Sequence, residues 1–365
     1  MPEAFHRRAG AFHGLDRVTD VPPLLSIVVP VHGVEQFLPR CLDSILAGQR
    51  SEDFEVIAVD DRSPDGCGAI LDDYAARDPR LRVLHLTENQ GLGGARIAAL
   101  PEARGSYLWC VDSDDWLPEG ALDAVLTELR AERPGELDVL LTGFSHVYPD
   151  DSTEPNPWRH LLAGSPLERP EGATLREHPA LLRTVLSVWN KIFYREYLDG
   201  LDVSFGRGFY EDISVTYPAL LAARRLRYLD RDCYNYRRGR PGAITATASA
   251  KHADAFAQYE AIFAFLDRRP DLADLRGLVF DRTVRQALTI YDTPGLVPAE
   301  LRRDFFHRIA AHFAAHRPPG YRYPGGVQGV RYRLAARDAR LGYDELRRAG
   351  RLPRTLKASL RGSRG

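Results

Sequence analysis

Cysteine is scarce in this sequence, with only four in 365 residues: Cys41, Cys67, Cys110 and Cys233. No two of them have the Cys-x-x-Cys spacing of a zinc site or a redox pair. Isolated cysteines in a chain of this length also do not favour a disulfide framework. The sequence therefore predicts reduced, buried thiols.

Long apolar segments are missing as well. The longest apolar stretch, Leu24–Val31, is far shorter than the roughly 20 residues that a membrane-spanning helix needs. Residues 1–20 lack the apolar core of a signal peptide. We therefore expect a cytoplasmic protein.

Neither sign of charge dominates the chain. Lysine and arginine number 49, aspartate and glutamate number 50, and the formal net charge is −1 at pH 7. A chain without an overall positive charge is not built to bind nucleic acid, so we expect no such partner. The composition, 44% hydrophobic and 27% charged, is typical of a globular protein with one large domain and an appendage, or with two modest domains.

The first part of the chain alternates apolar strands with amphipathic helices. The expected strands are 25–30, 54–59, 81–86, 107–111 and 138–144, and the expected helices are 35–47, 65–76, 92–100 and 118–129. Continuous apolar strands separated by helices predict a parallel sheet that is covered on both faces. The predicted fold class is therefore α/β, with a doubly wound, mostly parallel sheet.

The rest of the chain is less regular. Residues 1–22 predict a loose arm, and residues 146–180 a connecting loop. Further strands are expected at 189–194, 226–229 and 233–237, and a helix at 211–222. From about residue 249 the pattern is helical, at 250–267, 271–290 and 298–316, before a Pro/Gly-rich break at 318–326 and a basic tail.

Five carboxylates follow two of the predicted strands: Asp60, Asp61, Asp112, Asp114 and Asp115. Ligands of such sheets bind beyond the carboxyl ends of the strands, so we expect these side chains at one edge. Neighbouring carboxylates repel one another unless a cation neutralises them. An Asp-x-Asp turn offers hard oxygen ligands that suit Mg²⁺ or Mn²⁺. Helix capping is the simpler alternative for a single aspartate at such a position.

Four sequence blocks together resemble glycosyltransferase family 2, whose members are inverting enzymes with a GT-A fold. They are SIVVPVHGVEQFLPRCLDSIL at 26–46, VIAVDDRSPDG at 56–66, ENQGLGGARIAAL at 88–100 and YLWCVDSDDW at 107–116, and YED follows at 210–212. The resemblance implies metal-assisted transfer of a sugar from a nucleotide-sugar donor, such as a UDP-sugar, to a hydroxyl group. The acceptor is expected to be a cell-surface glycan, polymer or lipid-linked molecule, as in bacterial polysaccharide or teichoic-acid-like polymer synthesis.

The same resemblance assigns roles in donor binding. It places Pro30 against the nucleotide, and Asp61, with Asp60, at the nucleotide base. Arg96 matches a position near the nucleotide, where it could offset phosphate charge, although a solvated helix position is the simpler alternative. Asp112 is expected near the donor sugar and ribose. By the same match, Asp114 is the principal ligand of Mn²⁺ or Mg²⁺.

Asp212 matches the position of the catalytic base, which removes the proton of the acceptor hydroxyl. Glu211 lies beside it as a further substrate-binding residue, and the alternative is that both acids simply begin a helix. Trp189 and Lys191 match a stretch that borders the acceptor pocket. For them the alternative is a buried strand with the lysine in solvent. Arg237, Arg238 and Arg240 form a basic loop that could close over a diphosphate or an anionic acceptor, or remain solvated.

These assignments divide the chain into an arm, a GT-A domain at 23–248 and a helical region at 249–365. The nucleotide-binding half of the GT-A domain is 23–145, and the acceptor half is 146–248. The segment 331–365 is rich in arginine and could lie on the anionic inner face of the plasma membrane. A solvated C-terminal helix is the alternative.

Two other function classes, a dehydrogenase and a binding module without activity, fit the sequence less well. A nucleotide-dependent dehydrogenase is not favoured, because the run Gly91–Arg96 has arginine where the dinucleotide fingerprint needs glycine or alanine, and it does not follow the first strand. A catalytically weak GT-A domain that only binds nucleotide or glycan would be expected to lack the Asp-x-Asp motif or the base. Both are present in this sequence.

Overall fold

The structure is a computed structural model that describes residues 12–13, 22–47, 51–240 and 247–351. The chain forms two compact units. The first unit comprises Met1–Ala243 with Gln258–Leu272, and the second comprises Ile244–Ala257 with Ala273–Gly365.

Four parallel strands form the centre of the sheet in the first unit. They lie in the order β4-β3-β2-β5 and comprise β2 (Leu25–Val31), β3 (Phe54–Asp60), β4 (Leu81–His85) and β5 (Tyr107–Cys110). All seven residues of β2 and of β3 are buried, as expected for strands that are covered on both faces. The predicted α/β class with a doubly wound parallel sheet is confirmed.

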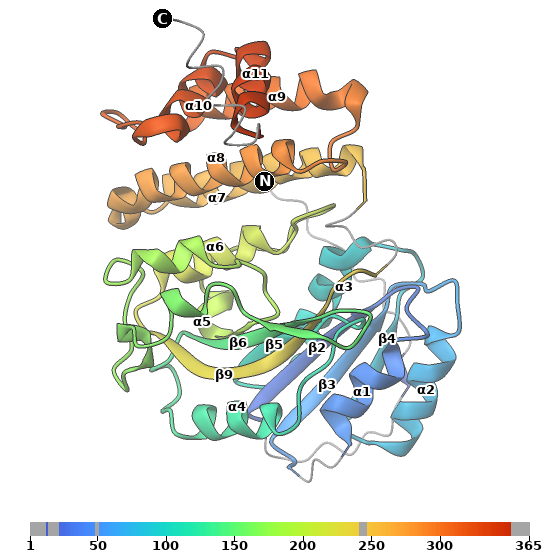
Figure 1. Ribbon diagram of the computed structural model, residues 1–365. Coiled ribbons are helices and arrows are strands. Elements are labelled where there is room, and N and C mark those ends of the chain that lie inside the picture. The colour runs from blue at the N-terminus through green and yellow to red at the C-terminus, as the bar shows by residue number, and fades with distance from the viewer. Residues whose placement is uncertain (1–11, 14–21, 48–50, 241–246, 352–365) are drawn as a thin grey trace, which may run out of the picture. The chain divides into compact units, whose positions relative to one another are not determined.

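Helices cover both faces of this sheet. They are α1 (Leu38–Leu46), α2 (Cys67–Arg77), α3 (Gly91–Ala99) and α4 (Ala121–Arg130). Alternate residues of β2, including Ile27 and Val29, pack with Leu42 and Ile45 of α1 in one apolar core. Figure 1 shows α1, α2 and α4 on one face of the sheet and α3 on the other. The start of α3 therefore lies near the edge where β2 and β3 end.

The sheet continues beyond β5 with a different topology from the one that the sequence suggested. The predicted strand at 138–144 is β6 (Val139–Val147), but it does not pair with β5. Instead β8 (Lys191–Tyr194) lies between β5 and β6 and is antiparallel to both. The two short strands predicted after residue 225 are one strand, β9 (Leu226–Arg237), which runs parallel to β6 with two register shifts.

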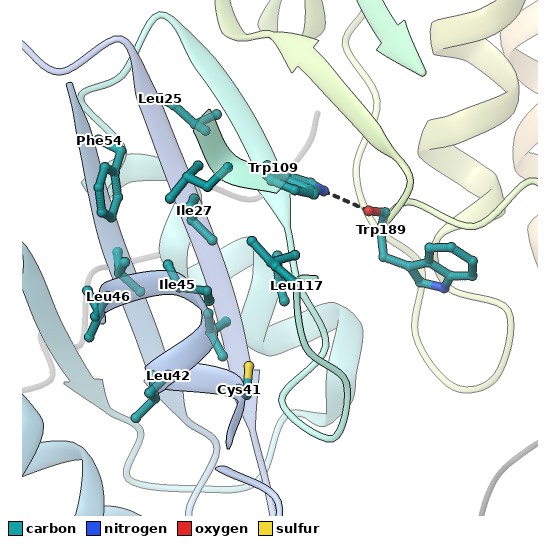
Figure 2. Close-up of a cluster of buried hydrophobic side chains, with 14 of the residues drawn as sticks. Leu25, Ile27, Cys41, Leu42, Ile45, Leu46, Phe54, Trp109, Leu117 and Trp189 are labelled. Atoms are coloured by element: carbon teal, nitrogen blue, oxygen red, sulfur yellow. Dashed lines mark hydrogen bonds between the residues drawn. The ribbon is translucent and has the colours of Figure 1, made fainter. Parts of the chain in front are cut away.

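Figure 2 shows a contact between β5 and Trp189, a residue just before β8. Trp109 of β5 is fully buried and donates its indole N–H to the carbonyl oxygen of Trp189, at 2.7 Å. Leu25 and Ile27 lie nearby in the same cluster of buried side chains. This contact fixes the residues just before β8 against the parallel part of the sheet.

Smaller elements complete the first unit. Residues 12–13 of the predicted arm form β1 (Phe12–His13), which pairs with β4, and the predicted loop at 146–180 contains β7 (Thr153–Pro155) and short 3-10 helices. The 3-10 segments are η1 (Leu100–Glu102), η2 (Arg159–Leu161), η3 (Pro166–Glu168) and η4 (Pro179–Arg183), and the α-helices are α5 (Arg195–Asp199) and α6 (Ile213–Ala222). Asp212 is the residue immediately before α6.

Helices build the second unit. They are η6 (Ala250–Ala253), α7 (Asp254–Asp267), η7 (Pro270–Leu275), α8 (Arg276–Asp292), η8 (Ala299–Leu301), α9 (Arg302–His316), α10 (Gly326–Ala336) and α11 (Arg340–Arg351), with α7 and η7 shared between the two units. Among the described residues, no helix combines the length and the apolar character that a membrane crossing requires.

Much of the predicted basic tail is part of this folded unit. Tyr332 of α10 and Tyr343 of α11 are fully buried. Arg331 forms an ion pair with Asp292 of α8, and Arg340 lies 3.1 Å from Asp344. The tail is therefore not a free extension over residues 331–351. Arg354, Lys357, Arg361 and Arg364 lie outside the described residues.

Candidate active site

The ends of β2 and β3 bring the first predicted acid into place. The backbone N–H of Asp61 donates to the carbonyl oxygen of Val31 at 2.9 Å, which continues the pairing of the two strands. The Asp61 side chain is buried, and its Oδ1 accepts a hydrogen bond from the Gln90 N–H at 2.6 Å. Burial raises the pKa of the Asp61 carboxyl, although the hydrogen bond from Gln90 opposes the rise. Asp61 therefore joins the sheet edge to the segment that begins α3.

The neighbouring acid has a different environment. Asp60 Oδ1 accepts the Ser63 N–H at 2.9 Å, and Asp60 Oδ2 lies 3.0 Å from His85 Nδ1. His85 Nε2 lies 3.1 Å from Asp72 Oδ1. Burial lowers the pKa of His85, but its hydrogen bonds to the two aspartates outweigh this effect and raise the pKa above its usual value. Both oxygens of Asp60 thus have partners in the protein.

Two residues near Asp61 were not singled out from the sequence. His32 follows β2, and its Nδ1 lies 2.9 Å from the carbonyl oxygen of Asp61. The Asn89 side-chain amide lies 3.1 Å from the same ring nitrogen. Pro30 is buried within β2, opposite Val59 of β3. The position of His32 directly after a buried strand was the available signal for its place at this edge.

The Asp-x-Asp turn after β5 is held by β9. Asp115 is buried, and its two carboxylate oxygens accept hydrogen bonds at 2.7 Å from the Tyr234 hydroxyl and from the Arg237 N–H. The Tyr234 hydroxyl also accepts the Asp112 N–H at 3.1 Å. Burial and the charge of Asp114 raise the pKa of Asp115 well above its usual value. Asp115 therefore fixes the turn in place.

Arg96 occupies the centre of the site rather than a solvated helix position. Its side chain is 1% exposed and forms two ion pairs, from Nη1 to Glu211 Oε1 at 2.6 Å and from Nη2 to Asp112 Oδ1 at 2.7 Å. Burial opposes the charge of the guanidinium, but the two carboxylates outweigh it and raise the pKa of Arg96. The alternative of a solvated Arg96 is wrong. Arg96 connects α3, the end of β5 and the segment before α6.

A glycine permits this burial. Gly93 lies one turn before Arg96, and a Cβ atom at Gly93 would overlap the carbonyl oxygen of Gly206 and meet the Glu211 side chain at 3.2 Å. Any larger residue would force α3 away from the segment that carries Glu211. Gly93 therefore sets the distance over which Arg96 reaches its partner.

Glu211 and Asp212 are adjacent in sequence but have different partners. Burial raises the pKa of Glu211 to about 7, although Arg96 opposes the rise. Asp212 is half-buried, and its Oδ2 accepts the Val188 N–H at 3.1 Å. Burial also raises the pKa of Asp212, and Arg96 again opposes the rise. Because Glu211 is committed to an ion pair and Asp212 is not, Asp212 is the better proton acceptor of the two.

Arginine and aromatic side chains surround the Asp-x-Asp turn. Arg240 Nε lies 2.8 Å from Asp114 Oδ2, and Arg237 Nε donates to the carbonyl oxygen of Asp114 at 2.8 Å. The Arg237 guanidinium lies over the rings of Phe37 and Trp116, each at 4.6 Å. Such contacts hold cations in a fixed place beside the turn. The predicted basic loop therefore lies beside the predicted metal ligand.

Asp112 and Asp114 fit a divalent cation. Their side chains remain partly exposed, at 20% and 24%. Among the described residues, only Arg96 and Arg240 form ion pairs or hydrogen bonds with these two carboxylates. Burial and the charge of Asp112 raise the pKa of Asp114. Two carboxylates that repel each other and keep access to solvent are the oxygen ligands that Mg²⁺ or Mn²⁺ prefers.

The two residues expected near the acceptor lie in the interior. Trp189 is buried and stacks on the rings of Tyr234 and Tyr236, with centroid distances of 4.5 and 5.4 Å. Lys191 is 0% exposed. The alternative of a solvated lysine is wrong, because β8 lies between two other strands and is covered on both faces. Direct contact between the Lys191 ammonium group and an acceptor does not fit this burial.

The sequence is similar to those of known glycosyltransferases. The sequence matches the family described as "Glycosyl transferase family 2" over residues 26–198. It is 36% identical over 247 residues to the uncharacterized glycosyltransferase EpsJ of Bacillus subtilis, covering 67% of this chain and 70% of EpsJ. Over 100 residues it is 40% identical to a poly(ribitol-phosphate) β-glucosyltransferase of Bacillus spizizenii, covering 27% of this chain and 16% of that enzyme.

The fold is similar to that of a solved structure. A crystal structure of S. aureus TarS residues 1–349 in complex with UDP-GlcNAc superposes with a TM-score of 0.71 at 22% sequence identity. The match covers 90% of this chain and 91% of that chain. At this level of identity the similarity establishes the fold only.

Proposed function

This chain belongs to glycosyltransferase family 2, and we propose that it transfers a sugar from a UDP-sugar to a hydroxyl of a cell-surface polymer with inversion of the anomeric centre. The observation that carries the proposal is the bridge made by Arg96. It joins Asp112, on the Asp-x-Asp turn, to Glu211, which adjoins the proposed base Asp212. The donor side and the acceptor side of the reaction are thus held by one buried cation.

The proposed donor site lies along the ends of β2, β3 and β5. Asp61 would contact the nucleotide base, while Pro30 and His32 border the same edge. Asp112 would contact the ribose and the donor sugar. The choice of a UDP-sugar is supported by TarS, which has the same fold and was crystallised in complex with UDP-GlcNAc.

Asp112 and Asp114 would hold Mn²⁺ or Mg²⁺, which when bound offsets the charge of the donor diphosphate. Arg237 and Arg240 flank the same turn and would contact the diphosphate oxygens. To do so, Arg240 would have to exchange its contact with Asp114 for one with the donor. The protein therefore supplies positive charge on the side of the site from which the diphosphate leaves.

Asp212 would act as the base in a single displacement. Its carboxylate would accept the proton of the acceptor hydroxyl while the oxygen attacks the anomeric carbon and the bond to the diphosphate breaks. The Val188 N–H would hold one carboxylate oxygen and leave the other for the acceptor. Arg96 would keep Glu211 ionised beside the base without competing for the acceptor proton.

The acceptor is proposed to be an anionic or hydroxyl-rich polymer of the bacterial cell surface. The family membership and the poly(ribitol-phosphate) glucosyltransferase relative support this class of acceptor. The arginines near Asp114 would suit a phosphate-containing chain as well as the donor diphosphate. Contact with the anionic inner face of the plasma membrane is proposed for the second unit, because α10 exposes Val327, Val330 and Arg333.

A screen of sugar nucleotides tests the donor assignment. Each nucleotide is added with Mn²⁺, with Mg²⁺ or with a chelator, and thermal unfolding is followed. A donor at 100 times its dissociation constant should stabilise the protein by about 2.7 kcal/mol, and the chelator should remove the effect. Stabilisation that does not depend on metal would contradict the proposed metal site, and transfer to a polyol-phosphate or glycan acceptor distinguishes an enzyme from a binding module.

A further inference from the structure

A fully buried lysine lies near the proposed base. Lys191 Nζ donates hydrogen bonds to three oxygens: Val185 O at 3.2 Å, Ser187 O at 2.7 Å and Asn190 Oδ1 at 2.8 Å. An ammonium group has three N–H donors, whereas a neutral amine has only two. Three acceptors around Nζ therefore favour the charged form. Burial favours the neutral form and lowers the pKa of Lys191 to about 7, although the charge of Asp212 opposes this fall.

The segment that Lys191 binds also holds Asp212. Two of the three acceptors, Val185 O and Ser187 O, lie in the segment 185–188. The next residue along, Val188, donates its N–H to Asp212 Oδ2 at 3.1 Å. Lys191 thus fixes the backbone that presents a hydrogen-bond donor to the base. Burial raises the pKa of Asp212, and the positive charge of Lys191 is one of the groups that oppose this rise.

Other charged groups face Asp212 from the surrounding elements. They are Arg96 from α3, which favours the carboxylate, and Asp112 from the end of β5, which disfavours it, while Glu211 lies next to Asp212 in the chain. Arg96 forms ion pairs with two other carboxylates, Asp112 and Glu211. Lys191 has no carboxylate within salt-bridge distance among the described residues, so its charge is available to act on Asp212.

We propose that Lys191 is a positioning residue for the reaction: its buried ammonium orders the segment 185–188 and keeps Asp212 ionised and oriented toward the acceptor. This role rests on the proposed function of Asp212 as the base. It replaces the role at the surface of an acceptor pocket that the sequence suggested. Lys191 does not touch the substrate and acts only through Asp212.

The first test compares Lys191→Met with Thr216→Val in a pH–rate profile. Thr216 Oγ1 donates to Leu186 O at 2.7 Å, so it holds the same segment without carrying a charge. Loss of the lysine charge removes one of the groups that favour the Asp212 carboxylate, and the acid limb of kcat/KM should therefore move to higher pH. Thr216→Val should leave the midpoint of that limb in place. The KM for the donor should stay near that of the unmodified protein in both variants.

Equal acid limbs in Lys191→Met and in the unmodified protein would overturn the proposal. Asp212→Asn is measured in parallel: near-normal turnover in that variant would refute the base assignment itself. The two failures are therefore distinguishable. A shift of the same size in Thr216→Val would show that order in the segment, and not charge, is responsible, and would refute the statement that the Lys191 charge keeps Asp212 ionised.

A second test avoids the substitution of Lys191. The chain contains only three lysines, Lys191, Lys251 and Lys357, so a sample with ¹⁵N-labelled lysine gives few side-chain signals. Because coupling is reciprocal, removal of the Asp212 charge should lower the titration midpoint of the buried lysine. An identical Lys191 titration in the unmodified protein and in Asp212→Asn would refute the proposed coupling, even if Lys191→Met fails to fold.

Discussion

Removal of the Arg96 guanidinium should destabilise the first unit strongly. Arg96→Met keeps most of the side-chain length and leaves Asp112 and Glu211 without their shared cation, in a place where Arg96 itself is 1% exposed. Breaking a buried ion pair by removing one partner costs about 3–5 kcal/mol, because the other charge remains buried. For a unit of this size, each kcal/mol lowers the unfolding midpoint by about 2–4 °C. We therefore expect a decrease of about 6 °C or more at pH 8.

The loss of stability should depend on pH in a defined direction. The Glu211 pKa is raised from 4.5 to about 7 in the folded protein, and Arg96 opposes the rise. Without Arg96 the folded-state pKa rises further, so Glu211 binds its proton more tightly in the folded than in the unfolded state. Such a group lowers stability as pH increases from the unfolded pKa through the folded pKa. The difference between Arg96→Met and the unmodified protein should be small near pH 4.5 and grow above pH 7.

Thermal and urea unfolding, followed by circular dichroism at several pH values, measure both effects. Arg130→Met is the matched control, because the pair between Arg130 and Asp53 is exposed, at 46% and 49%, and should contribute at most about 1 kcal/mol. Arg96→Met combined with Glu211→Leu should recover part of the lost stability, since the uncompensated charge is gone. Equal unfolding midpoints for Arg96→Met and Arg130→Met at pH 8 would refute the reasoning.

The remaining predictions concern the chemistry and the membrane. Asp212→Asn should cut turnover by roughly 10²–10⁴-fold with little change in donor affinity, and NMR of the product should show an inverted anomeric centre; retention would contradict the mechanism. Asp114→Ala should abolish metal-dependent donor binding in calorimetry while the circular dichroism spectrum stays the same, and unaltered activity across a metal titration would contradict the assignment. Val327→Ser with Val330→Ser and Arg333→Glu should weaken sedimentation with anionic liposomes at low salt, whereas the idea is wrong if the unmodified protein ignores these liposomes. Point variants are preferable to a truncation of the second unit, because α10 and α11 bury Tyr332 and Tyr343.

The parallel half of the fold follows directly from sequence patterns. Each predicted strand up to residue 111 is present, with its ends shifted by no more than one residue, because runs such as Leu25–Val31 are mostly apolar and have no competing helical periodicity. Helix starts were less accurate: the first helix begins at Leu38 and not at Glu35. Local signals define where an apolar strand begins and ends better than where a first helical turn forms.

The order of the strands in the second half of the sheet could not be predicted from the sequence in the same way. Nothing within Lys191–Tyr194 indicates that this strand inserts between β5 and β6, because that choice depends on partners that lie far earlier in the chain. β9 likewise contains two apolar patches, and its pairing with β6 shifts register between them. In the sequence these two patches therefore resemble two separate short strands. Pairing between distant strands is set by tertiary contacts that no local pattern records.

The buried cations of the site show where sequence reasoning reaches its limit. The acids were predictable because an aspartate after a buried strand lies at the binding edge whatever surrounds it. The cations were not, since an arginine or lysine in a helix or strand is normally solvated, and only its partners show otherwise. Arg96 meets Glu211 across 115 positions of sequence. The sequence signal for this burial lies in the three residues before Arg96. Gly93, Gly94 and Ala95 are small, so another backbone segment can pack closely against this part of α3. A charged side chain next to such a closely packed surface is buried and needs an ion-pair partner inside the protein.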